Sequence, residues 1–527
     1  MAKSVVIVGG GTAGWMTAAH LKKALPSLDI TLIESANIKT VGVGEATFST
    51  VKLFFDFLGL EEHEWMPHCN ATYKLAIKFV NWRADGGHFF HPFQRYDVVD
   101  GFNMGEWWLK LKKGQEPFDY SCFTIPAMCD AKCSPRFLDG RVFDDKVQEY
   151  FTVDFRGKKN ILAEHKVQYP YAYHFDASLL AKFLEGYGIK RGVKQIVDDV
   201  AEVKLREDGG ISHVVTKEHG EVHGDLFVDC TGFRGLLINQ TLGEPFIPFG
   251  DSLLCDRAIA LQIPKDIKTH GINPFTQATA MSAGWVWNIP LYGRIGTGYV
   301  YSSQFTSPEE AEKEFRAYLG PDSDGLPANH IRMRIGRCRN SWVKNCVAIG
   351  LSSGFVEPLE STGIFFIQNN IEELVNHLPA SSGYDEETVR SYNRVVANAI
   401  DGVRDFLILH YKTTDRNDNE FWRATKALKV SDDLAEKLAL WKKRLPNVRN
   451  INANFHGFDA YSYSVMLLGL NYHPETSLPA LDHIPTAGAE RAFRMMRERT
   501  ERLVATLPTQ LEYLTHVRAQ EGAPVVA

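Results

Sequence analysis

Residues 9–14 read Gly-Gly-Gly-Thr-Ala-Gly and follow directly on an apolar run. The spacing of Gly9, Gly11 and Gly14 allows a tight turn, a close approach of the backbone to a ligand, and close packing of the next helix on the strand. The amphipathic segment that follows, residues 12–25, would direct its free N–H groups and its dipole at phosphate groups. The spacing therefore predicts a site for the pyrophosphate of a dinucleotide.

Later strand ends indicate which dinucleotide is bound. The predicted strand 30–33 leads into Glu34, which lies roughly 20 residues beyond the turn, where an acid that binds ribose is expected. Asp229 ends another apolar run and is followed by Gly232, and Gly350 ends a third run. Strands that bring the chain back to the same site are typical of flavoproteins, which hold FAD extended across the fold. A nicotinamide dehydrogenase would not need the third of these strands, the one that ends at Gly350. The pattern therefore favours FAD.

The elements that would position these residues come from separate parts of the chain. We predict an α/β fold, a two-domain FAD-dependent monooxygenase-like architecture with a Rossmann-type βαβ nucleotide-binding domain. The predicted FAD-binding domain is discontinuous and comprises residues 1–80, 175–240 and 330–375. The substrate-binding part would comprise residues 81–174, 241–329 and 376–515, with a mainly helical C-terminal region, and residues 516–527 would form a flexible tail.

Composition narrows the class of protein. The 527 residues, 44% apolar and 23% charged, are ordinary for a globular protein with a large core. The net charge of −6 argues against a general nucleic-acid binder. The eight cysteines are scattered without the pairs of a metal site, so we expect no metal, reduced thiols and a cytoplasmic location. We also expect no signal peptide and no membrane span.

Several motifs resemble one enzyme family. Residues 284–290, Gly-Trp-Val-Trp-Asn-Ile-Pro, match the Trp-x-Trp-x-Ile-Pro signature of flavin-dependent halogenases. Residues 9–16 have that family's form of the nucleotide turn, and residues 355–363 and 70–79 are further close matches. Because these motifs extend over essentially the whole chain, the sequence resembles the tryptophan halogenases, in particular the branch that attacks C5 or C6 of the indole.

The resemblance implies a reaction in two places. A separate NAD(P)H-dependent reductase supplies FADH2, a flavin C4a-hydroperoxide forms with oxygen, and chloride or bromide is oxidised to hypohalous acid, which passes through a tunnel to the substrate. Lys74 matches the family lysine that engages this oxidant, by a hydrogen bond or as a chloramine. Glu360 matches the glutamate that accepts the ring proton. Lys78 and Glu357 are chemically equivalent rivals, and only the motif register selects between them.

The resemblance also assigns the cofactor and halide sites. Backbone amides at Thr362 and Gly363 would hold the halide, although a simple helix N-cap at this point is the alternative. Trp285 and Trp287 would separate the flavin from the substrate, so that the ring is halogenated and not hydroxylated. The residues expected to bind FAD are Gly9, Gly11, Thr12, Ala13, Gly14, Glu34, Ala46, Thr47, Asp229, Gly232, Gly350 and Gly363.

An indole needs flat apolar walls, and its amino-acid tail needs polar partners. Phe458 followed by Asp459 resembles the C5 pattern more than the C6 pattern, so attack at C5 is favoured and C6 is the alternative. The insertion typical of C7 enzymes is absent. The residues expected to bind the substrate are Phe48, Ser49, His91, Phe93, Gln168, Tyr171, Trp285, Phe458 and Tyr461.

The expected partners are free L-tryptophan and the flavin reductase, with no nucleic acid and no membrane. Homodimers are common in the family. One alternative is a halogenase of another indole, a phenol or a tryptophan within a peptide. A second is a single-component flavin hydroxylase, which would not need Lys74. A third is a non-catalytic flavoprotein scaffold, and the joint presence of Lys74, Glu360 and both tryptophans argues against it.

Overall fold

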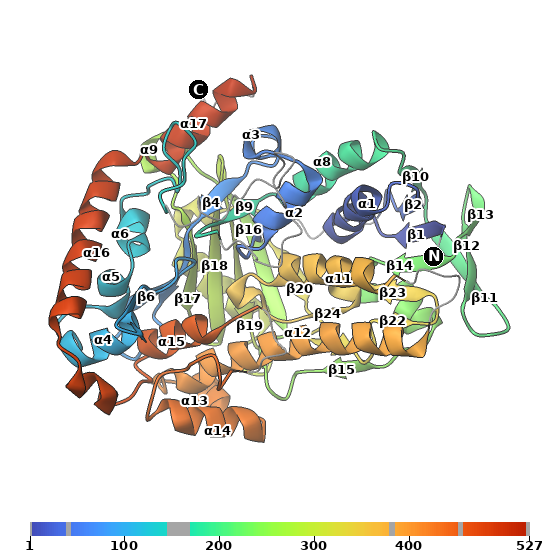
Figure 1. The fold of residues 1–527 in the computed structure, drawn as a ribbon. Helices are drawn as coiled ribbons and strands as arrows, with labels where there is room; N and C mark the ends of the chain where they lie inside the picture. Colours follow the sequence, from blue (N-terminus) through green and yellow to red (C-terminus); the bar gives the residue numbers. More distant parts are fainter. Residues whose placement is uncertain (1–2, 38–43, 145–168, 379–384, 452–456, 523–527) are drawn as a thin grey trace.

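The computed structural model describes residues 3–37, 44–144, 169–378, 385–451 and 457–522. Figure 1 shows one sheet at the right of the view and a second sheet near the centre, with helices around both. The long helix α12 runs along the bottom past both sheets, and α16 follows the left edge.

A six-stranded sheet carries the predicted nucleotide turn. β1 pairs in parallel with β2 on one side and with β14 on the other, and β14 pairs in parallel with β23. The predicted order of strand, glycine turn and helix is confirmed, as is the α/β fold class. The strands, in order across the sheet, are β10 (Lys194–Val197), β2 (Asp29–Glu34), β1 (Ser4–Val8), β14 (Leu226–Asp229), β23 (Cys346–Ala348) and β22 (Trp342–Val343).

A seven-stranded sheet forms the centre of the molecule. Its strands, in order, are β20 (Asn329–Arg332), β16 (Arg257–Pro264), β19 (Arg294–Tyr301), β18 (Gly284–Leu291), β17 (Phe275–Ala280), β5 (Ala76–Val80) and β6 (His88–Pro92). β5 falls inside the stretch 1–80 expected to belong to the FAD-binding domain, yet it pairs with β17 and β6 in this second sheet. The expected boundary at residue 80 therefore does not follow the sheets.

Smaller sheets complete the β structure. They consist of β3 (Glu45–Ala46), β9 (Ala172–Phe175) and β4 (Thr72–Lys74); β11 (Val200–Leu205), β12 (Ile211–Thr216) and β13 (Gly220–His223); β15 (Phe246–Pro248), β21 (Gly336–Cys338) and β24 (Gly354–Phe355); and β7 (Val98–Val99) with β8 (Phe102–Asn103). The first of these positions Lys74, because β4 pairs with the central strand β9.

Helices cover both sheets and dominate the C-terminal third, as predicted. Those packed near the six-stranded sheet include α1 (Thr12–Ala24), α8 (Ala177–Ile189), α11 (Gly363–His377) and α12 (Glu386–Thr413). The others are α2 (Val51–Leu58), α3 (Glu62–Trp65), α4 (Met104–Leu111), α5 (Phe118–Cys122), α6 (Ile125–Asp130), α9 (Ile267–His270), α10 (Pro308–Leu319), α13 (Glu420–Ala427), α14 (Asp432–Trp441), α15 (Ala460–Gly469), α16 (Ala487–Thr506) and α17 (Gln510–Gln520). Since α17 continues to Gln520, residues 516–520 are helical and not part of a flexible tail.

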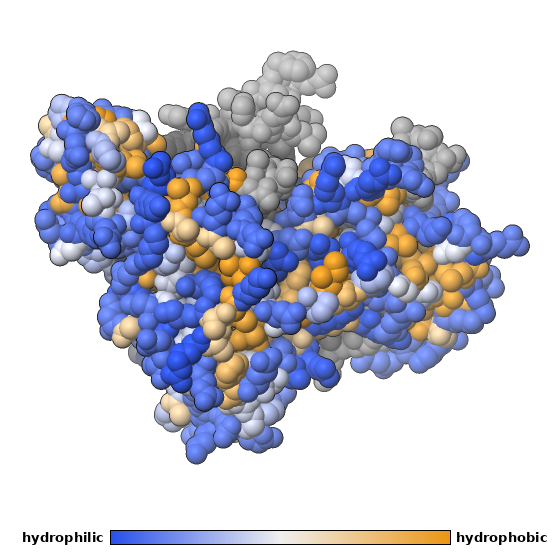
Figure 2. Space-filling view, turned by 90° about the horizontal axis from the view of Figure 1, so that it is seen from below, coloured by the Kyte–Doolittle hydropathy of each residue, from blue (hydrophilic) through white to orange (hydrophobic). Residues whose placement is uncertain are grey.

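Burial follows the expected pattern. All eight cysteines are buried and free, as predicted from their scattered positions. Figure 2 shows one face of the molecule that is mainly hydrophilic, with hydrophobic residues in narrower areas between the polar ones. Within the described ranges, no helix combines the length and the apolar character needed to cross a membrane.

Candidate active site

A cavity of about 1160 Å³ lies beside the glycine turn. Its volume exceeds the roughly 300–1,000 Å³ typical of pockets for small ligands, as a dinucleotide requires. The expected FAD-binding residues that line it are Gly9, Gly11, Thr12, Ala13, Glu34, Ala46, Gly232, Gly350 and Gly363.

The walls of this cavity fit a cofactor that carries phosphate. Gly9 has a φ of +116°, and a Cβ atom on Gly14 would lie 1.8 Å from the carbonyl oxygen of Gly9, so the turn needs both glycines. Gly11 caps α1 without a side-chain hydrogen bond to the first-turn amides, which suits an anionic ligand. Trp287 also lines the cavity, and its buried Nε1 has no hydrogen-bond partner among the described residues. A cofactor with polar ring atoms could satisfy it.

Three residues expected to bind FAD lie outside the cavity lining. Gly14 acts through packing, as described above. The Asp229 carboxylate accepts hydrogen bonds from the backbone N–H groups of Thr231, Leu237 and Ile238 at 2.7–2.9 Å. It therefore shapes the loop that carries Gly232. The Thr47 hydroxyl donates to the carbonyl of Tyr173, and the Thr47 carbonyl faces Lys74.

Lys74 is completely buried at the end of β4. Its Nζ donates to the carbonyl oxygen of Thr47 at 3.1 Å and to Oγ of Ser361 at 2.8 Å, and it lies 5.3 Å from the centre of the Phe93 ring. Burial lowers the pKa of Lys74 to about 7, although the charge of Glu360 acts to raise it. At neutral pH this amine is therefore present both with and without its extra proton.

Lys78, the rival lysine, lies elsewhere. Its Nζ is 4.0 Å from the Asp130 carboxylate and about 5 Å from the centre of the Phe90 ring. It remains partly exposed on β5. Of the two lysines, Lys74 alone is fully buried and hydrogen-bonded to a residue of the cavity wall.

Glu360 is buried at the end of the 3₁₀ turn Pro358–Glu360. One carboxylate oxygen lies 2.8 Å from Nε2 of His410, and the other lies 3.1 Å from Nδ1 of His91. Burial alone would raise the pKa of Glu360, but the two histidines hold it at about 2. The group is therefore an ionised carboxylate in an apolar interior.

Glu357, three residues earlier, has a different environment. Its Oε2 accepts from Nε1 of Trp285 at 3.0 Å and from the hydroxyl of Tyr411 at 2.6 Å. Burial raises the pKa of Glu357 to about 7, against the effect of these hydrogen bonds. In the sequence, only the motif register distinguished these two glutamates. In the structure they differ, because Glu360 faces histidines and Glu357 faces neutral donors.

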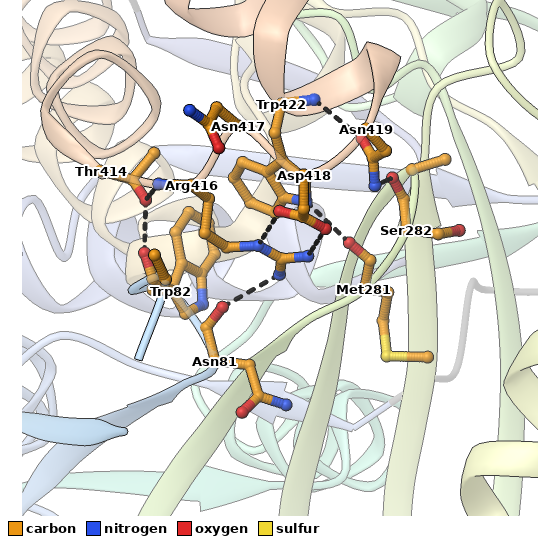
Figure 3. A network of polar contacts seen from close by, with 12 residues as sticks. Asn81, Trp82, Met281, Ser282, Thr414, Arg416, Asn417, Asp418, Asn419 and Trp422 are labelled. Atoms are coloured by element: carbon orange, nitrogen blue, oxygen red, sulfur yellow. Dashed lines mark hydrogen bonds and ion pairs between the residues drawn. The ribbon is translucent and has the colours of Figure 1, made fainter. Parts of the chain in front are cut away.

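His410 and Tyr411 reach these glutamates from the last turn of α12, whose end is fixed by a polar network (Figure 3). Thr414 donates to the carbonyl of Trp82, and Arg416 donates to the carbonyl of Asn81 at 2.9 Å. The guanidinium of Arg416 also pairs with Asp418 through two contacts of 2.9 Å. The network ties the helix to the end of β5.

Beyond this point the chain is held against β17 and the loop that follows it. Asn419 donates to the carbonyl of Ser282 at 2.9 Å, and Nε1 of Trp422 donates to the carbonyl of Met281 at 3.0 Å (Figure 3). The position of His410 is therefore set by a rigid surrounding structure.

Expected substrate residues gather into an aromatic cluster near Lys74. The Phe48 ring lies 5.8 Å from Phe93 and 5.3 Å from Phe458, in both cases edge to face. The His91 ring lies 6.4 Å from Phe458 and 6.0 Å from Tyr461. These residues come from β6, α15 and the segments beside α2, so the fold brings together side chains that are hundreds of residues apart.

Both residues of the tryptophan pair lie on β18. Trp287 lines the cavity, and Trp285, whose ring centre is 6.3 Å away, binds Glu357 instead of joining the aromatic cluster. The arrangement fits the expected separating role of the pair better than a direct role of Trp285 in binding substrate.

The expected halide segment adopts an unusual backbone. α11 begins at Gly363, and the N-cap residue Thr362 makes no side-chain capping bond, so the simple N-cap alternative is not found. Ser361 has a left-handed φ of +61°, and both Ser361 and Gly363 line the cavity. The uncapped first turn of α11 suits an anion.

Tyr171 does not belong to the aromatic cluster. Its hydroxyl donates to Glu62 at 2.9 Å and accepts from Arg136 at 2.6 Å, in a buried cluster that also contains Tyr73 and Tyr173. Among the described residues, Tyr171 therefore shares no hydrogen-bond partner with Lys74, although both were expected to lie at the substrate site.

Two other expected substrate residues are not seen in the cluster. Gln168 lies outside the described residues. Ser49 is half-buried in the turn before α2.

Two side chains in the site had no role in the sequence-based prediction. Ser361 lies in the matching segment 355–363 but was assigned no role there, and its bond to Lys74 depends on a left-handed turn. His410 was not considered. A histidine beside a tyrosine on an apolar helical segment is a weak signal, because such a residue is usually a satisfied core group.

Comparisons with known proteins agree with these features. The family model described as tryptophan halogenase matches residues 4–168 and 154–486. SttH of Streptomyces toxytricini, a tryptophan 6-halogenase, is 54% identical over 97% of this chain and 97% of that protein. KtzR of Kutzneria sp. (strain 744), a 7-chloro-L-tryptophan 6-halogenase, is 52% identical over 98% of this chain and 99% of that protein.

The fold agrees as well. The solved structure of Tar14, a flavin-dependent tryptophan C-6 halogenase (chlorinase) from taromycin biosynthesis, superposes with a TM-score of 0.92. It is 50% identical and covers 98% of this chain and 100% of that chain.

Proposed function

Because the chain belongs to the flavin-dependent tryptophan halogenase family, we propose that it halogenates free L-tryptophan at C6 of the indole, with FADH2 supplied by a separate reductase. The observation that carries this proposal is the position of Lys74. Its buried amine is bonded to Ser361, a residue of the cavity wall, and lies beside the Phe93 ring.

FAD would be held by the glycine turn of residues 9–14, with Glu34 at its ribose and the wall residues Gly232 and Gly350 along its length. When bound and reduced, the flavin would activate O2, and the O2 supplies the oxidising equivalents that turn chloride or bromide into an electrophilic halogen. The chain itself supplies the apolar walls, the uncapped first turn of α11 for the halide, and Trp287 on the cavity side of the tryptophan pair.

Lys74 and Glu360 would act at the ring. A neutral amine can engage an electrophilic halogen, and burial keeps part of Lys74 neutral at pH 7. Glu360, ionised and buried, would accept the proton that the ring carbon loses when aromaticity returns. The hydrogen bonds from His91 and His410 fix the orientation of this carboxylate.

The aromatic cluster of Phe48, His91, Phe93, Phe458 and Tyr461 fits a flat indole. The Tyr461 hydroxyl is buried and has no hydrogen-bond partner among the described residues. A polar group of the substrate would satisfy it. This supports a small substrate with both an aromatic ring and a polar tail, which is the chemistry of a free aromatic amino acid.

The C5 expectation depended on the resemblance of Phe458 and Asp459 to the C5 pattern. In the structure Asp459 caps α15 by accepting from the backbone N–H of Tyr461 at 3.1 Å, and it pairs with Arg95. SttH, KtzR and Tar14 are all 6-halogenases by name. We therefore propose C6, the former alternative.

One incubation tests the proposal. It contains the protein, FAD, an unrelated flavin reductase, NADH, oxygen, chloride or bromide, and tryptophan. We expect a monohalogenated product by mass spectrometry, in which proton NMR shows H4 of the indole coupled to an ortho neighbour and H7 with only a narrow meta coupling. An H4 with only a narrow meta coupling would instead establish C5 attack.

KtzR takes a substrate already chlorinated at C7 by its name. A parallel incubation with 7-chlorotryptophan compares the two substrates, and we expect a higher kcat/KM for tryptophan. A higher kcat/KM for 7-chlorotryptophan would contradict the free-tryptophan assignment while leaving the C6 chemistry in place. If neither substrate is halogenated by an active mixture, the alternative substrates are indoles, phenols and peptides.

A further inference from the structure

We propose that His410 is a positioning residue that carries a positive charge at neutral pH, balances the charge of Glu360, and thereby keeps Lys74 able to lose its proton. The inference deepens the proposed function, because it concerns how the amine of Lys74 is held ready for reaction. It follows from the partners of the two ring nitrogens of His410.

Both nitrogens of His410 face hydrogen-bond acceptors. Nδ1 lies 2.7 Å from the carbonyl oxygen of Phe406, and Nε2 lies 2.8 Å from Oε1 of Glu360. A carbonyl oxygen only accepts, so Nδ1 must carry a hydrogen. A second hydrogen must lie between Nε2 and the carboxylate for that contact to be a hydrogen bond. The pair therefore holds two protons, and an ionised Glu360 requires both of them on the histidine.

His91 differs in this respect. Its Nδ1 donates to Glu360 at 3.1 Å, and no described residue bonds its other nitrogen. A neutral His91 with its hydrogen on Nδ1 satisfies this geometry fully. Of the two histidines that contact Glu360, His410 alone needs a positive charge.

Burial strengthens the argument. The side chain of His410 is 0% exposed and that of Glu360 is 1% exposed. An isolated carboxylate is costly in such a place, whereas a hydrogen-bonded ion pair is tolerated. The charge and hydrogen bond of His91, together with those of His410, hold the pKa of Glu360 at about 2 against the effect of burial, so the carboxylate is ionised beside His410.

The charge balance then bears on Lys74. Burial lowers the pKa of Lys74 to about 7, and Glu360 acts in the opposite direction. A cationic His410 offsets the Glu360 charge, so less of that charge acts to hold the proton on Lys74. The other titratable groups around this pair are His91, His174 and Tyr461, and His174 is kept neutral by burial and by Lys74.

The pair also has a fixed geometry. The His410 ring packs 5.5 Å from Phe79 and 4.9 Å from Phe406, and the end of α12 is clamped by the Arg416 network of Figure 3. His410 cannot turn away from Glu360 without disturbing that packing, so its charge stays close to the carboxylate.

The first test measures the proton directly and needs no turnover. Nitrogen NMR of ¹⁵N-histidine-labelled protein at pH 7.5 should show one ring protonated on both nitrogens that is absent from His410→Gln. The same ring should become neutral in Glu360→Gln. A neutral His410 ring in the unaltered protein would overturn the proposal, whether or not the protein halogenates tryptophan.

The second test separates charge from hydrogen bonding. His410→Gln keeps a donor for Glu360 but carries no charge, and His410→Phe removes both. If charge matters, both variants lose about fivefold in kcat at pH 7, because a rise of one unit from a pKa of about 7 lowers the neutral fraction of Lys74 by about that factor, with little change in KM for tryptophan. The rate of His410→Gln should recover as the pH is raised, because Lys74 then loses its proton. A Gln variant equal to the unaltered protein at every pH, or one with a loss that does not depend on pH, would contradict the proposal.

Discussion

The Nζ atom of Lys74 lies 2.8 Å from Oγ of Ser361, and Ser361 is part of the cavity wall. Ser361 thus links the cavity proposed to hold the flavin to Lys74, which is proposed to act on the indole. It does so with a left-handed φ of +61°, a conformation that is unfavourable for a residue other than glycine, by about 1 kcal/mol or more. Such backbone strain is a known feature of functional sites.

Replacing Ser361 should therefore change stability and activity in opposite directions. In Ser361→Gly the left-handed backbone is relaxed, so we expect the Tm to stay equal or rise, while loss of the hydroxyl lowers kcat by about tenfold, as for a charge-assisted hydrogen bond. Thermal unfolding and steady-state kinetics check this. Ser361→Ala is the control, with the same loss of activity and no gain in Tm. A Gly variant with full activity would show that the hydroxyl is dispensable.

Lys74→Ala should abolish halogenation while FAD still binds, because Lys74 is outside the cavity lining that would hold the cofactor. Product formation by mass spectrometry and flavin fluorescence titration measure the two properties. Lys78→Ala is the matched control and should remain active, since Lys78 is partly exposed and pairs with Asp130 and not with a residue of the cavity wall. Equal losses in both variants would refute the assignment of the reactive amine.

Glu360→Gln should lower turnover strongly, by about 10²-fold or more, with little effect on folding, because an amide cannot accept the ring proton. Glu357→Gln should cost less, since Glu357 has neutral donors as partners and a pKa near 7, and a neutral side chain suits that place. Single-turnover rates and thermal unfolding compare the two. The reverse order would move the proton-accepting role to Glu357.

The rate should rise with pH through about 7 and then level off. The pKa of Lys74 is lowered to about 7 by burial, so its neutral fraction is lost as the pH falls through that value. Below this point kcat should fall by about tenfold per pH unit. The measurement uses a saturating supply of FADH2 so that the reductase does not limit the rate. A rate that rises toward low pH would mean that the charged amine is the reactive form.

Tyr171→Phe should leave the KM for tryptophan unchanged and lower the free energy of unfolding by about 1–3 kcal/mol, since the ionised Glu62 loses a donor in a buried place. Burial alone would raise the pKa of Glu62, but Arg136 and other partners hold it at about 2. Chemical denaturation and steady-state kinetics test this. A large rise in KM with unchanged stability would restore the substrate role predicted for Tyr171.

Local signals in the sequence predicted the nucleotide-binding part of the site. The apolar strand, the glycine turn and the amphipathic helix are short-range patterns, and the structure confirms them in β1 and α1. Lys74 and Glu360 were selected by motif register, and the structure separates each from its chemical rival. The roles themselves stay predictions.

Features that depend on long-range pairing were not visible in the sequence. The predicted boundary at residue 80 does not follow the sheets, because β5 joins β17, about two hundred residues later. The Tyr171 hydroxyl is bonded to Glu62 and Arg136, outside the aromatic cluster, and its substrate role stays a prediction. His410 reaches Glu360 only through the packing of α12. No local pattern in the sequence carries that information.

The six-stranded sheet has a consequence for how the protein is made. β1 leaves the ribosome well before its neighbour β14, which ends at Asp229, and before β23, which ends at Ala348. The cavity beside the nucleotide turn therefore cannot be completed until most of the chain has been synthesised. Strand pairings this distant in sequence also form slowly. During synthesis one edge of the apolar strand β1 can pair with β2, but the edge that pairs with β14 stays open and prone to aggregation until β14 is made. We expect the yield of folded protein to depend on translation speed and chaperones more than on the stability of the finished fold.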